Sequence, residues 1–135
     1  MSVQEFLQAL ARCLGLPQLM LNADGACAVR LSDGLLLDVQ ILAACEEVRW
    51  TLPLGQPDPA HLAAVLAEAL AANHLMGRKV PRHFAFETER GSLVLCETLR
   101  LEQLSCTSLR DDLDHFLEAC RQTRQEVHRA GSITS

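Results

Sequence analysis

The sequence predicts an α+β domain with a mostly antiparallel, twisted sheet and flanking helices, in the order helix, three strands, helix, two strands, helix. Apolar residues recur at helical spacing near both ends and in the middle of the chain, and they alternate with polar residues between these segments. Strands come in runs and not in strict alternation with helices, which favours α+β. The 135 residues, 49% of them hydrophobic, are enough for one core, so we expect a single domain over 1–129.

The first helix is predicted from a capping box and an apolar stripe. Ser2 and Glu5 have the S-x-x-E spacing in which each side chain bonds the backbone N–H of the other residue. Gly15 and Pro17 end the helix, because glycine favours the residue after a helix and proline cannot continue one. The stripe contains Val3, Phe6, Leu7, Leu10, Ala11 and Leu14.

Three strands follow, over about 27–31, 35–42 and 47–54. The Asp-Gly turn at 32–34 is a strong hairpin signal between the first two. Pro53 removes a ladder donor, so we expect the third strand to end there or to lie at an edge. The apolar face of this meander is predicted to contain Val29, Leu35, Leu37, Val39, Ile41, Val48, Trp50, Leu52 and Leu54.

The second helix is rich in alanine. Asp58 suits the N-cap and Pro59 the first helical position, and the helix runs to about Leu75. Small residues let two backbones approach closely, and this leaves two interpretations open: packing inside the monomer, or a helix–helix contact across a dimer. The small-residue ridge consists of Ala63, Ala67 and Ala71, beside Leu70.

The last third of the chain predicts two strands and a long helix. The strands cover 83–88 and 93–99, with Phe84 and Phe86 on one face. The helix begins near Thr107 or Ser108, and its apolar pattern stops after Cys120, so we expect its end to be solvated or frayed. Residues 130–135 are small and polar and are predicted to be a disordered tail.

Charge and targeting signals argue against nucleic-acid and membrane partners. The net charge is −5, from 12 Lys+Arg and 17 Asp+Glu, and an acidic chain repels phosphate backbones. The one basic cluster, at 78–83, is short and contains no aromatic residue for base stacking, so we interpret it as a solvated loop. The sequence has no bilayer-length apolar run and no secretory signal, which predicts a cytoplasmic protein.

The sequence also lacks the spacing that cofactors, metals and catalysis need. None of the six cysteines forms a C-x-x-C pair and no histidine stands at ligand spacing beside one, so we interpret them as small buried hydrophobes. All seven glycines stand alone, which excludes a phosphate-cradling loop. A Cys–His nucleophile pair stays open, because such partners meet in space. We therefore predict no cofactor, no metal site and no enzymatic activity.

The chain has more apolar surface than one small sheet can bury. Leu36 and Leu42 lie on the face of the second strand opposite to Leu35 and Leu37. An exposed apolar patch usually marks a protein-binding surface, although the last helix or a loop could cover this one.

The order and spacing of these elements resemble the class I chaperones of type III secretion, the Tir-chaperone family. The resemblance covers nearly the whole chain and comes from a shared pattern and not from one specific motif. It is carried by the Gly-Leu-Pro break at 15–17, the Asn-Ala-Asp-Gly turn at 22–25, Leu-Ala-Ala-Asn at 70–73, His-Phe-Ala-Phe at 83–86, Leu-Val-Leu at 93–95 and Phe-Leu-Glu-Ala at 116–119.

The resemblance implies a homodimer that uses no ATP. Such chaperones bind an extended segment near the N-terminus of a secreted effector, keep the effector secretion-competent and help to deliver it to the export apparatus. The implied effector contacts are Phe6, Leu10, Leu36 and Leu42, and the implied dimer contacts are Ala63, Ala67, Leu70, Ala71, Phe84 and Phe86.

Two alternatives remain at this point. One is an adaptor or regulatory protein-binding module on the same α+β scaffold, which would need the same dimer and grooves. The other is a small enzyme that uses a cysteine, which a thiol of depressed pKa would support.

Overall fold

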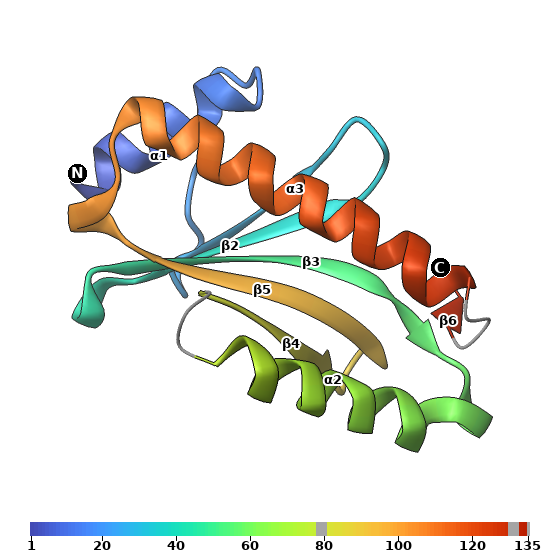
Figure 1. Cartoon of the computed structure of the whole chain (residues 1–135). Helices are drawn as coiled ribbons and strands as arrows, with labels where there is room; N and C mark the ends of the chain where they lie inside the picture. Colours follow the sequence, from blue (N-terminus) through green and yellow to red (C-terminus); the bar gives the residue numbers. More distant parts are fainter. Residues whose placement is uncertain (78–80, 130–132, 135) are drawn as a thin grey trace.

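A computed structural model of the chain describes residues 1–77, 81–129 and 133–134 (Figure 1). The helices are α1 (Val3–Cys13), α2 (Leu62–Met76) and α3 (Cys106–Arg129). The strands are β1 (Ala26–Arg30), β2 (Leu36–Leu42), β3 (Glu47–Pro57), β4 (Arg82–Glu87), β5 (Ser92–Arg100) and β6 (Ile133–Thr134). Short 3₁₀ turns at Ala43–Cys45, Pro59–His61 and Leu101–Gln103 connect some of them. The predicted order of helices and strands is confirmed.

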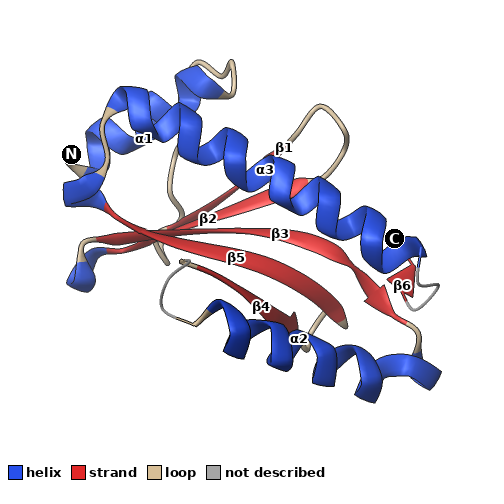
Figure 2. Ribbon diagram, in the orientation of Figure 1, coloured by secondary structure: helices blue, strands red, loops and turns tan. Residues whose placement is uncertain are grey.

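The strands form one antiparallel sheet in the order β1-β2-β3-β5-β4, with β6 paired to the far end of β3. The first three strands are the predicted meander, and the β4–β5 hairpin joins it through β5. Strands β1 and β4 are therefore the two edges. Figure 2 shows α3 lying along the sheet, α1 next to α3, and α2 beside β4.

The predicted capping box forms at the start of α1. The backbone N–H of Glu5 donates to the Ser2 hydroxyl at 3.1 Å, and the Ser2 N–H donates to the Glu5 carboxylate at 3.3 Å. The backbone bond also lowers the pKa of the Glu5 carboxyl. The helix ends at Cys13, and Gly15 follows with φ of 69°, a conformation that glycine adopts without a steric penalty.

The core lies between the sheet and its helices. Alternate residues of β2 and β3 are buried as predicted, because one face of each strand packs on the helices. Trp50 stacks on Phe116 of α3, with ring centroids 5.9 Å apart. The largest fully buried side chains are Trp50, Phe6, Phe116, Leu10, Leu37, Leu52, Leu54, Leu109, Val39, Val48 and Cys120.

A buried carboxylate completes this core. Glu97 on β5 accepts from the Trp50 indole Nε1 at 3.1 Å and from the Arg82 Nε at 2.7 Å. The Glu97 side chain is only 4% exposed and that of Arg82 is 27% exposed. Arg82 belongs to the basic cluster that the sequence places in a loop. The structure places Arg82 and His83 in β4, and residues 78–80 lie outside the described residues.

The expectation for Pro53 is met in part: β3 does not end there but runs on to Pro57, and the proline itself lies on a local edge that β2 no longer covers. The β2–β3 ladder has already ended at Thr51, and the β3–β5 register shifts between Pro53 and Gly55. The carbonyl oxygen of Pro53 accepts from the Arg124 guanidinium at 3.0 Å. The proline therefore lies where β3 has lost its β2 neighbour and needs no N–H on that side.

The end of α3 is largely solvated, as expected, because none of residues 121–128 is buried, and it remains helical. The helix continues for nine residues after Cys120, and the bond from Arg124 to Pro53 ties its last turns to β3. Of the tail predicted to be disordered, 130–132 and 135 lie outside the described residues, while the backbone of Ile133–Thr134 pairs with β3. In the described part of the chain, no helix combines the length and apolarity that a membrane span requires.

Candidate functional site

The β4 edge of the sheet is covered by α2. The Asn73 side chain accepts from the Phe84 backbone N–H at 2.7 Å and donates to the Phe84 carbonyl at 2.9 Å. These two bonds occupy the backbone groups that Phe84 would offer to a further strand. The family-like Leu-Ala-Ala-Asn sequence at the end of α2 thus occupies the middle of this edge, and the helix itself lies beside the strand.

The β1 edge is open. The backbone of Gly25 bonds Ile41, and that of Leu31 bonds Leu35, so odd-numbered residues of β1 face β2 and even-numbered ones face outward. Among the outward residues, Ala26 is occupied by Asn22, which accepts from its N–H and donates to its carbonyl. In the described chain no hydrogen bond is made by the backbone groups that Ala28 and Arg30 point outward. This edge can therefore accept an added strand.

An apolar slot of about 230 Å³ lies beside this edge, between β1, α3 and the loop after α1. By comparison, a cavity of about 150 Å³ holds benzene. The slot is large enough for one bulky side chain of a strand that pairs with β1. Its apolar lining consists of Leu14, Leu16, Val29, Leu31 and Leu117, together with Cys13.

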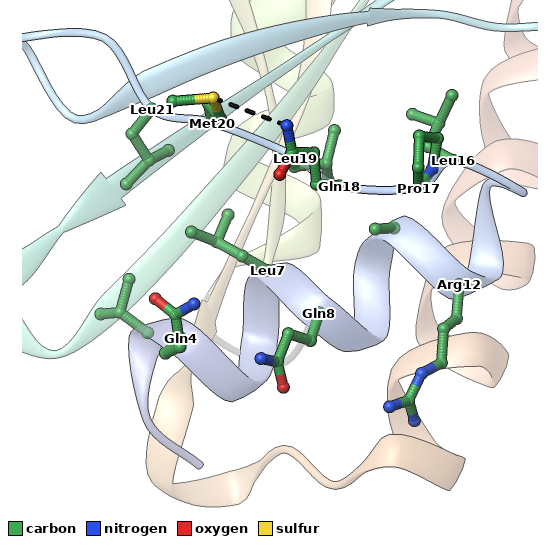
Figure 3. Close-up of a pocket in the computed structure, with 12 residues that line it drawn as sticks. Gln4, Leu7, Gln8, Arg12, Leu16, Pro17, Gln18, Leu19, Met20 and Leu21 are labelled. Carbon is green, nitrogen blue, oxygen red and sulfur yellow. Dashed lines mark hydrogen bonds between the residues drawn. The ribbon is translucent and has the colours of Figure 1, made fainter.

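A larger groove of about 720 Å³ runs between α1 and the segment 16–21 (Figure 3). Leu7 points from α1 toward this segment, whereas Arg12 points away from it. Leu16 is 36% exposed and Met20 is 75% exposed, which makes them two of the four large apolar side chains most open to solvent in the described chain. Leu16 lines both the groove and the slot, so the two hollows are neighbours.

The structure divides the four side chains predicted to contact an effector. Phe6 and Leu10 have no exposed surface, because they point from α1 into the core. Leu36 and Leu42 are half-buried on β2. The accessible apolar residues of α1 are on the flank of its stripe, at Val3 and Leu7. The helical period places Phe6, Leu10 and these two accessible residues on one stripe of α1. It does not indicate which part of that stripe the sheet covers.

The outer face of α2 is apolar and exposed. Val65 is its one buried residue, and Val65, Ala69 and Asn73 face the core and β4. At 100° per residue, the opposite half of the helix is exposed and carries only Glu68 and His74 as polar groups. The interpretation that the small-residue ridge packs inside the monomer is therefore wrong. The apolar residues of this exposed half are Ala63, Ala64, Ala67, Leu70, Ala71 and Leu75.

The two phenylalanines of β4 lie beside this helix. Phe84 packs against the core, and both Phe84 and Phe86 are half-buried. Leu70 is 68% exposed and Leu75 is 85% exposed, so neither side chain belongs to the core of the monomer. The predicted dimer residues thus fall into an exposed group on α2 and a half-buried pair on β4.

A cysteine and a histidine lie side by side on two paired strands of the described chain. His83 and Cys96 are directly opposite each other on β4 and β5. Burial raises the pKa of the Cys96 thiol and, together with Arg49, lowers the pKa of His83, so both groups stay neutral. This is the reverse of the thiolate–imidazolium pair of a cysteine nucleophile. No cluster of three His, Cys, Asp or Glu side chains suited to a metal ion occurs within residues 1–77, 81–129 and 133–134.

The cysteines occupy three kinds of environment. All six are free thiols, and two of them, Cys13 and Cys27, are half-buried. Cys96 and Cys120 are buried, as the sequence predicts, and burial raises the pKa of Cys120 to about 12. Cys45 and Cys106 are exposed, so for them the interpretation as buried hydrophobes is wrong. Cys45 lies in the connection after β2 and Cys106 at the start of α3, where the core needs no side chain.

Comparison with known proteins identifies the class to which this fold belongs. A sequence model of the Tir chaperone protein (CesT) family matches residues 5–124. This match covers most of the chain, and the chain belongs to the CesT family. A search of curated proteins gives no match.

Solved structures confirm the fold of a type III secretion chaperone. The chain is similar to one in the ExsC–ExsE complex, with a TM-score of 0.77 and 17% identity over 93% of this chain and 96% of that one. It is also similar to one in the complex of the Yersinia pestis chaperone SycH with a YscM2 fragment, with a TM-score of 0.69 and 18% identity over 90% and 99%. YbjN, a candidate transcription regulator from E. coli, gives 0.68 and 13% over 96% of both chains.

Proposed function

We propose that the protein is a non-enzymatic, homodimeric chaperone that binds the N-terminal chaperone-binding segment of a type III secretion effector and keeps that effector soluble and secretion-competent. The observation that carries this proposal is the open β1 edge, which lies next to the apolar slot, whereas α2 covers the other edge and Asn73 bonds its Phe84 backbone. Family membership supports it, as do similar chains in the HopA1–SchA chaperone–effector complex and the ExoT–SpcS complex.

The binding mechanism follows from the outward groups of β1. An extended client bonds the N–H and C=O groups of Ala28 and Arg30, and alternate client side chains point toward the slot. Each bulky apolar side chain buried there contributes about 2 kcal/mol, and each backbone bond adds about 1 kcal/mol. Several such contacts offset the entropy lost when a disordered client segment becomes ordered.

The exposed half of α2 is the surface that we assign to the dimer. A ridge of alanines allows two copies of the helix to approach closely, and a two-fold axis makes one patch contact itself. Leu70 lies within this ridge and is 68% exposed. Burying Leu70 and Leu75 in each subunit removes from water the two most exposed large apolar side chains of this helix.

A pair of charge insertions tests the two surfaces separately. Leu70→Asp is expected to convert the dimer to a folded monomer, because it buries a carboxylate in an apolar contact. Leu16→Asp, on the slot beside β1, is expected to leave the dimer intact and to weaken client binding. Sedimentation equilibrium measures the first effect. A Leu70→Asp protein that remains dimeric would exclude α2 as the dimer contact.

Isolation from the native host tests the client. Tagged wild-type protein is purified from cells that express the secretion system, and mass spectrometry identifies what co-purifies. We expect a secreted protein in stoichiometric amount, with the chaperone protecting a stretch near its N-terminus from limited proteolysis. A monomer without a client would contradict the proposal.

A second candidate is an adaptor or regulator that binds another protein with the same surfaces. The similarity to YbjN supports this second candidate, because that candidate transcription regulator has the same fold at 13% identity over 96% of its length. The co-purification separates the two candidates. A partner that is itself regulatory and is not secreted would support the second.

A further inference from the structure

A hollow of about 320 Å³ continues from the apolar slot toward the end of α3. It lies between the turn after β1 and the last turns of α3, and it shares Asp33 and Arg121 with the slot. Leu35, Arg124 and His128 also line this hollow. We call this hollow the α3 groove. The slot and the α3 groove therefore form one path that starts at the β1 edge.

Basic groups predominate along this path, although the whole chain has a net charge of −5. Arg30 and Arg121 lie at the slot, and Arg121, Arg124 and His128 lie along the α3 groove. Asp33 is the acidic residue that lines both hollows, and its carboxylate already accepts from the Leu35 N–H at 3.1 Å.

The basic side chains differ in their availability. Arg124 is fixed on the Pro53 carbonyl oxygen. Arg121 is 56% exposed, and its contact with Glu118 at 3.4 Å joins two groups that are both more than half exposed. Such a pair contributes little, so Arg121 can exchange it for another carboxylate. The Nε2 of His128 is buried and has no hydrogen-bond partner in the described chain, so of the three side chains along the α3 groove Arg121 is the one most open to a client.

We propose that the client segment carries acidic residues directly beside its apolar anchor, and that these contact Arg121 and the α3 groove. The inference rests on the proposed client site at β1 and adds the charge of the segment that binds there. A strand paired with Ala28 and Arg30 reaches the turn at 32–34 when it passes Arg30. The slot and the α3 groove meet at that turn, so the next client residues lie over Arg121.

The electrostatic preference is moderate because Arg121 is exposed. Exposed charge pairs change an equilibrium by about twofold to fivefold each. The preference decreases as salt rises, since the Debye length falls from about 10 Å at 0.1 M to about 3 Å at 1 M. An acidic flank also repels the remaining acidic surface of the chaperone, which restricts the client to this path.

Selection of peptides tests the charge preference without knowledge of the client. The full chain is used to select from a displayed library of random twelve-residue peptides, as wild type, as Arg121→Glu and as Arg110→Glu. Arg110 is an exposed arginine on the same helix, about 16 Å from Arg121 along the helix axis, and serves as the matched control. Circular dichroism and thermal unfolding establish that the variants are folded.

We expect peptides selected by the wild type to contain a bulky apolar residue next to Asp or Glu, enriched about twofold to fivefold over the library. Arg121→Glu removes this enrichment or reverses it toward Lys and Arg, while Arg110→Glu selects as the wild type does. Equal selection by all three proteins, or no acidic preference in the wild type, overturns the inference and leaves the client site intact. Failure of the wild type to select any peptide overturns the client site at β1 as well.

Discussion

The open edge predicts a specific effect of Ala28→Pro. The N–H of Ala28 points away from β2, so its loss removes no bond of the β1–β2 ladder. Proline is tolerated on an edge strand for this reason. The substitution removes a donor from the surface offered to the client, and the ring stands where the client backbone would approach. It therefore separates client binding from folding.

The expected magnitude follows from the number of backbone bonds. Ala28 offers one donor and one acceptor, and each hydrogen bond has a net value of about 1 kcal/mol. Proline keeps its carbonyl, but its ring holds the client backbone away from that acceptor, so both bonds are lost and client binding weakens by about 2 kcal/mol, which is about 30-fold in Kd. The free energy of unfolding should change by less than about 1 kcal/mol, because the ladder bonds belong to Cys27 and Val29.

Titration calorimetry of the co-purified client segment measures the change in Kd, and urea unfolding measures stability. Val29→Pro is the matched control, because the N–H of Val29 faces β2 and its loss should destabilise the fold. If Ala28→Pro binds the client as tightly as the wild type and is equally stable, the client does not add to β1, and the reasoning from the open edge is refuted.

Three further predictions concern the core and its titratable groups. Arg82→Ala should lower the free energy of unfolding by about 3 kcal/mol in urea, because it leaves the Glu97 side chain, which is 4% exposed, without its ion-pair partner. Adding Glu97→Gln should restore part of this loss, and a loss below about 1 kcal/mol would contradict the prediction. Cys45 should react rapidly with a thiol reagent at pH 8, whereas Cys120, with its pKa of about 12, should react only after unfolding. Burial and Arg49 lower the pKa of His83, so the unfolded chain binds the proton more tightly than the folded one. The free energy of unfolding should therefore fall as the pH decreases through about 6.5. His83→Gln should reduce this pH dependence, and an unchanged dependence would contradict the prediction.

The order of elements could be predicted from sequence because its signals are local. The box of Ser2 and Glu5, the Asp-Gly turn at 32–34 and the alternation along β2 each involve residues close together in the chain. Pro53 shows where local reasoning fails. Whether a proline disturbs a strand depends on the neighbour that it faces. Here β2 has already ended, and Arg124, 71 residues away, donates to the Pro53 carbonyl oxygen in place of a strand.

The site was less predictable than the fold for the same reason. The α1 stripe includes both Phe6 and Leu7, but the packing of the sheet and α3 buries Phe6 completely and leaves Leu7 at the groove. No local signal marks the segment 16–21 as the second wall of that groove. The contacts that the family resemblance implied for this helix were therefore placed on its core side.

The sequence by itself determined the α+β order, the capping of α1, the absence of metal-ligand spacing and the resemblance to the chaperone family. The tertiary structure alone decided which edge of the sheet is open, because Asn73 reaches the backbone of Phe84 across the α2–β4 connection. It also decided which apolar residues stay accessible. Periodicity identifies an apolar face, but only the packing of distant elements determines whether that face is covered.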